Sequence, residues 1–127
     1  MIAGALSGLL LLAADQAVEP VNWPKSFEGR WNRSASGCID DEANDITISP
    51  SKILYYESED VIRSGTPVRN RSVELKVRRN VADYDEPEKI VAAKVRLTLS
   101  PDGGALLFDD PTWLKWDLVR CPLQRPD

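Results

Sequence analysis

The stretch VAAKVRLTLSPDGGALLF, residues 91–108, decides the fold. In its first half, every second side chain is apolar, and the positions between them hold Ala92, Lys94, Arg96 and Thr98. Successive side chains of a β-strand point to opposite faces, so this period of two predicts a strand with one buried face. The turn-forming run 101–104 predicts a hairpin that returns through residues 105–108. The side chains expected to point inward are Val91, Ala93, Val95, Leu97 and Leu99.

The same pattern of short period-two runs and turn signals repeats along the chain. No helical periodicity accompanies it outside the N-terminal leader. With the hairpin above, the chain yields about eight strands, which is typical of a small antiparallel barrel or sandwich. Short connections favour a meandering barrel, because consecutive strands then pair with each other. The further runs span residues 26–34, 46–49, 52–59, 61–68, 73–78 and 112–121.

Size and composition restrict the function. The 127 residues make one domain, and 43% hydrophobic with 28% charged residues is typical of a globular protein. A net charge of −4 argues against nucleic-acid binding. The chain has no histidine, the usual general base and the commonest transition-metal ligand. We therefore expect no catalytic residue, no cofactor and no metal site.

The N-terminus predicts export. Residues 2–14 carry no charge, and at about 13 residues the segment is shorter than the roughly 20 needed to span a bilayer. It predicts a signal peptide over residues 1–17, cleaved after Ala14 or Ala17, followed by one barrel-like domain over 18–127. No Lys or Arg precedes the apolar run, so an uncleaved anchor or a misassigned start stays open. We expect no stable membrane span.

The two cysteines agree with export. Cys38 and Cys121 lie near the two ends of the predicted domain, and an even count is typical of secreted domains with disulfides. A bridge between them would contribute about 4–5 kcal/mol to stability. Two unrelated buried thiols are the alternative. A paired state predicts a periplasmic or secreted protein.

Acidic clusters recur in the predicted loops. Hard cations prefer several carboxylate oxygens, so each cluster is either a calcium site or a solvated loop. None of the clusters has the alternating spacing and central glycine of a calcium-binding loop, and solvated loops are favoured. The clusters are Asp40-Asp41-Glu42 with Asp45, then Asp83, Asp85, Glu86 and Glu88, and Asp109-Asp110.

Positive charge concentrates between residues 63 and 79, where Glu74 alone opposes it. Such a patch would suit an anionic protein or an anionic polymer of the cell envelope. The alternative is cross-strand pairing with Glu57, Glu59 and Asp60. Tyr56 joins the candidate contact residues, because adjacent Tyr55 and Tyr56 cannot both face inward on a strand. The cations are Arg63, Arg69, Arg71, Lys76, Arg78 and Arg79.

Several short motifs carry family resemblances. Phe27-Glu28-Gly29-Arg30-Trp31, Cys38, Tyr56-Glu57-Ser58 and Leu118-Val119-Arg120-Cys121-Pro122 form an F-x-G-x-W…C…Y-E-S…R-C-P pattern. The pattern resembles that of a group of small exported bacterial proteins of unknown function. Ser64-Gly65 is similar to the start of the Ser-Gly-x-x-Tyr motif of periplasmic lysozyme inhibitors, although no tyrosine follows here.

A further resemblance is to lipocalins, in which a Gly-x-Trp opens the first strand and a late arginine packs on the tryptophan. Gly29, Trp31 and Arg120 are the matching positions. The resemblance implies that Arg120 stacks on Trp31 and closes one end of the barrel. It also implies a cavity for a small apolar ligand.

The sequence thus predicts an exported, monomeric, non-enzymatic binding module, such as an inhibitor or an envelope-stress protein, which contacts its partner through a charged face. A lipocalin-like carrier is the alternative. An enzyme with paired carboxylates is the third possibility, and would need both carboxylates in a concave site.

Overall fold

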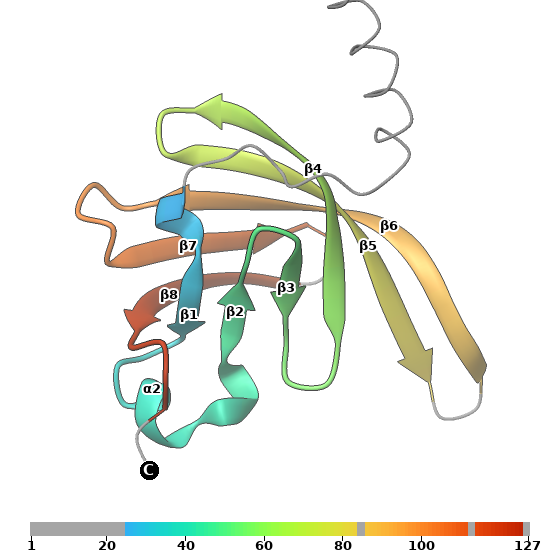
Figure 1. Ribbon diagram of the computed structural model, residues 1–127, viewed down its shortest axis with the longest axis horizontal. Helices are drawn as coiled ribbons and strands as arrows, with labels where there is room; N and C mark the ends of the chain where they lie inside the picture. The colour runs from blue at the N-terminus through green and yellow to red at the C-terminus, as the bar shows by residue number, and fades with distance from the viewer. Residues whose placement is uncertain (1–24, 84–85, 112–113, 126–127) are drawn as a thin grey trace, which may run out of the picture.

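The computed structural model describes residues 25–83, 86–111 and 114–125. Its strands form a closed antiparallel barrel in which each strand pairs with the next and β1 pairs with β8 (Figure 1). The predicted all-β fold is confirmed, as a barrel and not a sandwich. The strands are β1 (Gly29–Asn32), β2 (Ile46–Ile48), β3 (Lys52–Leu54), β4 (Glu59–Arg69), β5 (Ser72–Asp83), β6 (Glu86–Leu99), β7 (Ala105–Asp110) and β8 (Leu114–Cys121).

Short helical segments flank β1. They are the 3-10 helices η1 (Lys25–Phe27) and η2 (Glu42–Asn44) and the α-helix α2 (Gly37–Asp40). The predicted loop that holds the acidic cluster of residues 40–45 contains α2 and η2. Helices this short contain too few residues for an apolar period to be visible. None of the helices in the described ranges has the length and apolar character needed to cross a membrane.

The predicted hairpin of residues 91–108 is present, with β6 paired to β7. Val95, Leu97 and Leu99 are buried, whereas Lys94 and Arg96 are exposed. The prediction of an inward, buried Val91 is wrong with respect to burial, since this side chain is 40% exposed. The reason is that β6 pairs with β7 only over Arg96–Leu99, and Val91 lies beyond that contact.

The core is one hydrophobic cluster drawn from all eight strands and η1, with Trp31 and Phe108 among its largest side chains. Burial of each such side chain contributes roughly 1.5–3 kcal/mol. The members are Phe27, Trp31, Ile46, Ile48, Ile53, Ile62, Val73, Leu75, Val77, Val95, Leu97, Leu99, Leu106, Phe108 and Leu118.

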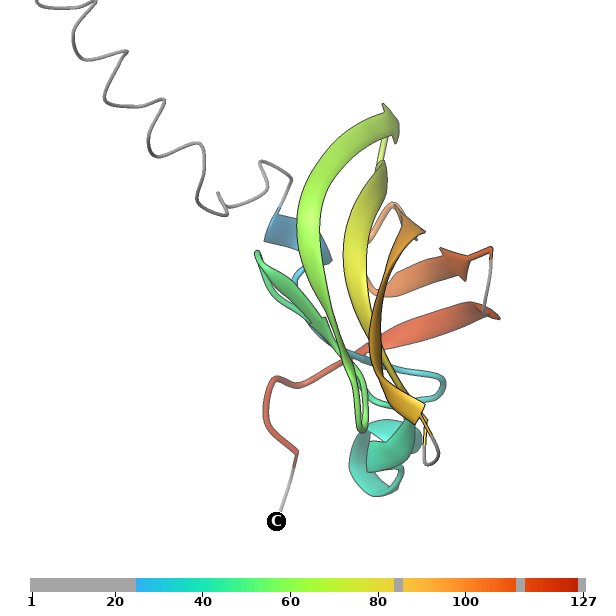
Figure 2. The same cartoon turned by 90° about the vertical axis from the view of Figure 1, so that its right-hand side faces the viewer.

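Strand lengths differ sharply around the barrel. β2 and β3 have 3 residues each, whereas β4, β5 and β6 have 11, 12 and 14. The long strands therefore extend past their short neighbours (Figure 2). The predicted strand 52–59 ends early at Leu54, because the Tyr55 N–H bonds the Ser58 carbonyl and turns the chain. Pro67 lies next to a register shift in β4, where a missing N–H is tolerated.

The predicted disulfide between Cys38 and Cys121 is present, with Cα atoms 5.4 Å apart. It links α2 to the end of β8. The predicted signal peptide and the first residues of the predicted domain, 18–24, lie outside the described residues, as do Thr112 and Trp113.

Candidate functional site

The structure divides the predicted cationic patch into three places. Arg63 and Arg78 lie with Lys76 on the outer face of β4 and β5. Arg69 and Arg71 are exposed at the β4–β5 turn, where Arg71 has a positive φ of 63°.

Arg79 is the exception within the patch, because its side chain is buried in a polar network. Its Nε and Nη2 donate to the two carboxylate oxygens of Asp60, each at 2.8 Å. Nη2 also lies 2.6 Å from Oδ2 of Asp110, and the Tyr55 hydroxyl donates to Asp60 at 2.6 Å. Its assignment to the contact surface is therefore wrong. The alternative of cross-strand pairing applies to this residue.

The network is sealed from solvent, since Asp60 is 0% and Asp110 2% exposed. Burial, together with the adjacent Asp60 carboxylate, raises the pKa of Tyr55 and keeps the phenol neutral. The hydrogen bonds that Arg79 donates to the Asp60 carboxylate raise the pKa of Arg79 and keep it charged. Both carboxylates are therefore buried and lie against the Arg79 guanidinium.

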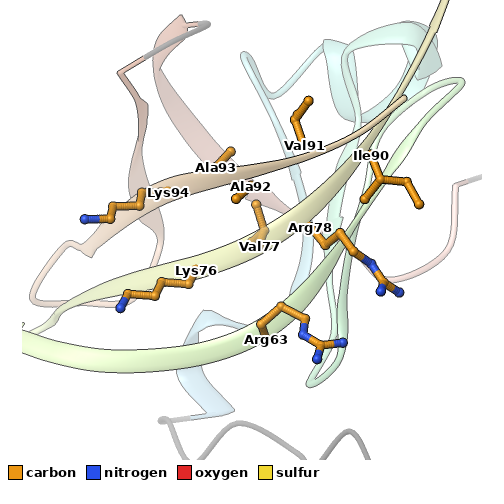
Figure 3. Close-up of a pocket in the computed structure, with 9 residues that line it drawn as sticks. All are labelled: Arg63, Lys76, Val77, Arg78, Ile90, Val91, Ala92, Ala93 and Lys94. Atoms are coloured by element: carbon orange, nitrogen blue, oxygen red, sulfur yellow. The ribbon is translucent and has the colours of Figure 1, made fainter. Parts of the chain in front are cut away.

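An open groove of about 640 Å³ lies on the long strands (Figure 3). It is lined from β4, β5 and β6, and the strand register places Lys76 opposite Lys94 and Arg78 opposite Ala92. The apolar lining includes Ile90, which is 60% exposed. The lining residues are Arg63, Lys76, Val77, Arg78, Ile90, Val91, Ala92, Ala93 and Lys94.

The charges of this groove, which we call the cationic groove, have no internal partners. Within the described ranges, Arg63, Lys76, Arg78 and Lys94 make no ion pair within 4.0 Å, and no acidic residue lines the groove. Like charges directly opposite on neighbouring strands are destabilising, yet Lys76 faces Lys94. Among the described residues, the cationic groove thus holds four cations without an ion-pair partner.

No protein-family model, curated protein or solved structure matches the chain. The family resemblances of the sequence therefore stay predictions.

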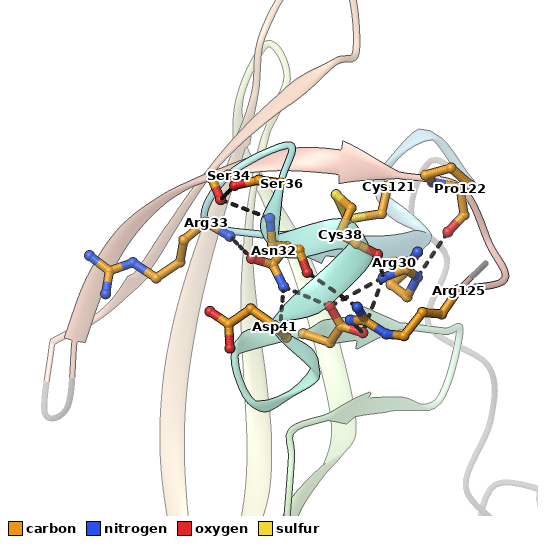
Figure 4. Close-up of a disulfide and its surroundings, with 12 residues drawn as sticks. Arg30, Asn32, Arg33, Ser34, Ser36, Cys38, Asp41, Cys121, Pro122 and Arg125 are labelled. Carbon is orange, nitrogen blue, oxygen red and sulfur yellow. Dashed lines mark hydrogen bonds and ion pairs between the residues drawn. A yellow bond between two sulfur atoms is a disulfide. The ribbon is translucent and has the colours of Figure 1, made fainter. Parts of the chain in front are cut away.

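The surroundings of the disulfide show how the fold satisfies charges that it does not expose (Figure 4). Asp45 accepts hydrogen bonds from Arg30 at 3.1 Å, from Asn32 at 2.7 Å and from Arg125 at 2.6 Å. Arg30 also donates to the carbonyls of Cys38 and Pro122, beside the disulfide. Asp45 is therefore occupied by protein donors. No group of three His, Cys, Asp or Glu side chains among the described residues is arranged to hold a metal ion.

The Gly29, Trp31 and Arg120 contact is present as the sequence predicted. The Arg120 guanidinium lies 4.2 Å from the ring centroid of Trp31. It donates to the carbonyls of Ser26, Glu28 and Gly103. Gly29 has a φ of +138°, and a Cβ there would come within 2.9 Å of the guanidinium. These contacts join η1, the β6–β7 turn and β8.

Tyr56, the remaining predicted contact residue, is 59% exposed in the turn after β3 and does not line the cationic groove. Sequence analysis missed Lys94 and Ile90 as site residues. Both have the outward parity of β6, which was visible in the sequence. The pairing register that brings them beside Lys76 and Arg78 was not.

Proposed function

We propose that this chain is an exported, non-enzymatic binding module that holds an anionic partner in the cationic groove. The observation that carries the proposal is the set of four unpaired cations around exposed apolar side chains. Electrostatic attraction would speed the encounter, and the apolar surface of Ile90 and Val91 would add contact area.

The disulfide supports export, because such bonds persist in oxidising compartments. The predicted signal peptide agrees with this location. An inhibitor or an envelope-stress protein that acts as a monomer on an anionic partner would fit both features.

The packing of the interior favours this function over that of a lipocalin-like carrier. A carrier needs an apolar cavity, whereas the side chains of the interior cluster are at most 6% exposed and pack as a single group.

Binding of a fluorescein-labelled polyglutamate peptide, measured by fluorescence anisotropy at low salt, tests the proposal. We expect Arg63→Glu combined with Lys94→Glu to weaken binding at least about tenfold, equal to about 1.4 kcal/mol. The control, Arg69→Glu with Arg71→Glu, makes the same change in net charge outside the groove and should weaken binding by less than about threefold. Equal binding by the groove variant and the parent protein would refute the proposal.

A further inference from the structure

Among the described residues, β6 has a strand partner on only one side over half its length. It pairs with β5 from Glu86 to Thr98, whereas its pairing with β7 is confined to Arg96–Leu99. The backbone of residues 89–95 therefore presents an open edge to which another strand can hydrogen-bond.

The side chains on this edge alternate in character. Val91 and Ala93 share the inward parity of buried Val95, whereas Ile90 and Lys94 have the outward parity of the groove cations Lys76 and Arg78. β6 keeps an unbroken register with β5 from residue 89 to residue 98, so the parity holds across the open edge.

We propose, on the basis of the function above, that the anionic partner is an extended protein segment that adds as a strand to this edge. Its acidic side chains would share the outer face with Lys94, and its apolar side chains would lie beside Val91 and Ala93. Directly opposed residues on paired strands have Cβ atoms about 4.5–5.5 Å apart, so a carboxylate reaches Lys94. Lys76 and Arg78 lie on the next strand, and add their attraction.

Charge decides between this occupant and a second copy of the chain. Two copies joined edge to edge would bring their two cationic grooves side by side on one face, and lysine on an edge strand commonly prevents such pairing. An acidic segment instead neutralises the groove cations. An anionic polysaccharide would satisfy the charges but not the backbone groups of residues 89–95.

The test uses the oxidised protein and an octapeptide of alternating glutamate and valine. Two further versions carry backbone N-methyl groups, one on every glutamate and the other on every valine. Alternate residues of an edge strand bond the neighbouring strand, so one methylated version should lose at least about tenfold in affinity while the other stays within about threefold. Which version fails depends on whether the segment runs parallel or antiparallel to β6.

The outcomes separate the two proposals. If both methylated peptides bind like the parent peptide and Arg63→Glu with Lys94→Glu weakens all three, the groove binds anions and strand addition is refuted. If no peptide binds but dextran sulfate does, the partner is a polymer and strand addition is again refuted. If neither probe binds, both proposals fail. Concentration-dependent dimers that the peptide does not dissociate would assign the edge to a second copy.

Discussion

The disulfide end and the cationic groove differ in whether their cations have partners within the protein. At the disulfide end, Arg30 and Arg125 share Asp45, and Arg120 donates to three backbone carbonyls. In the groove, none of the four cations meets a carboxylate within the described residues. The same side-chain type therefore holds the fold together in one region and stays available for a ligand in the other.

The difference lies in what surrounds each strand. Arg30 and Asn32 occupy positions on β1 that would face solvent in an isolated barrel, but both are buried beneath α2 and the C-terminal segment. Nothing described covers the outer face of β5 and β6 in this way. Whether a neighbouring segment lies over a strand thus determines which of its cations are structural.

The largest expected effect is the loss of stability when the disulfide is removed. Replacing both cysteines, Cys38→Ala with Cys121→Ala, should lower the free energy of unfolding by about 4–5 kcal/mol, because the unfolded chain loses the restraint of an 83-residue separation. Urea denaturation measures the loss. The folded fraction should still bind polyglutamate with the affinity of the parent, since the groove lies on other strands. A loss below about 1 kcal/mol would show that the bridge does not hold this end together.

Arg78 and Arg79 are adjacent in the sequence, but Arg78 is exposed whereas Arg79 is buried and paired with carboxylates. Arg79→Ala leaves Asp60 and Asp110 buried without their cation and should cost about 3–5 kcal/mol. Arg78→Ala should change stability by no more than about 0.5 kcal/mol, because its side chain is exposed. Thermal and urea unfolding measure both stability changes. In the anisotropy assay, by contrast, Arg78→Ala should weaken polyglutamate binding more than Arg79→Ala does. Similar stability losses in the two variants would contradict the division between structural and free cations.

Much of this division follows from strand periodicity. The alternation of residues 91–99 predicts which face of β6 is outward, and the turn at 101–104 predicts its partner. One disulfide followed from the even cysteine count, and the Trp31–Arg120 contact from a family resemblance. These features are local, or depend on few residues.

The features that could not be predicted depend on where each strand ends and on which neighbouring segments cover it. Val91 has the expected parity but stays exposed, because β7 ends before reaching it. Arg79 is indistinguishable from Arg78 in a list of charges, and its burial follows from the network with Tyr55 and Asp60. Lys94 joins the site only through the register between β5 and β6. Strand ends and register are set by tertiary contacts, and period-two patterns do not encode them.

A smaller effect is expected at the contact that closes the barrel. Arg120→Ala removes the stacking on Trp31 and three hydrogen bonds to backbone carbonyls, and should cost about 1–2 kcal/mol. In a domain of this size the Tm should fall by about 4–8 °C per kcal/mol. Arg33→Ala is the matched control, since exposed Arg33 stacks on Trp116 at 5.0 Å, and we expect at most about half the loss. Weaker polyglutamate binding by Arg120→Ala at unchanged stability would move Arg120 from the structural set to the binding surface.

The smallest effect concerns pH, and uses the adjacent tyrosines. Burial and Asp60 raise the folded-state pKa of Tyr55 above its unfolded value of about 10. Above that value the unfolded chain releases a proton that the folded chain keeps. The contribution to stability is therefore complete below pH 10, and is lost as the pH rises toward the folded-state pKa. Between pH 10 and 11 this should lower the free energy of unfolding by about 1 kcal/mol.

Tyr55→Phe should remove this part of the alkaline loss, while Tyr56→Phe, at an exposed position, should keep it. Urea denaturation of the three proteins at pH 8, 10 and 11 isolates the difference, because lysines that titrate in the same range contribute equally to all of them. If Tyr55→Phe loses as much stability over that interval as the other two, the phenol is not held neutral by the Asp60–Arg79 network. The buried network of Tyr55, Asp60 and Arg79 would then be open to solvent.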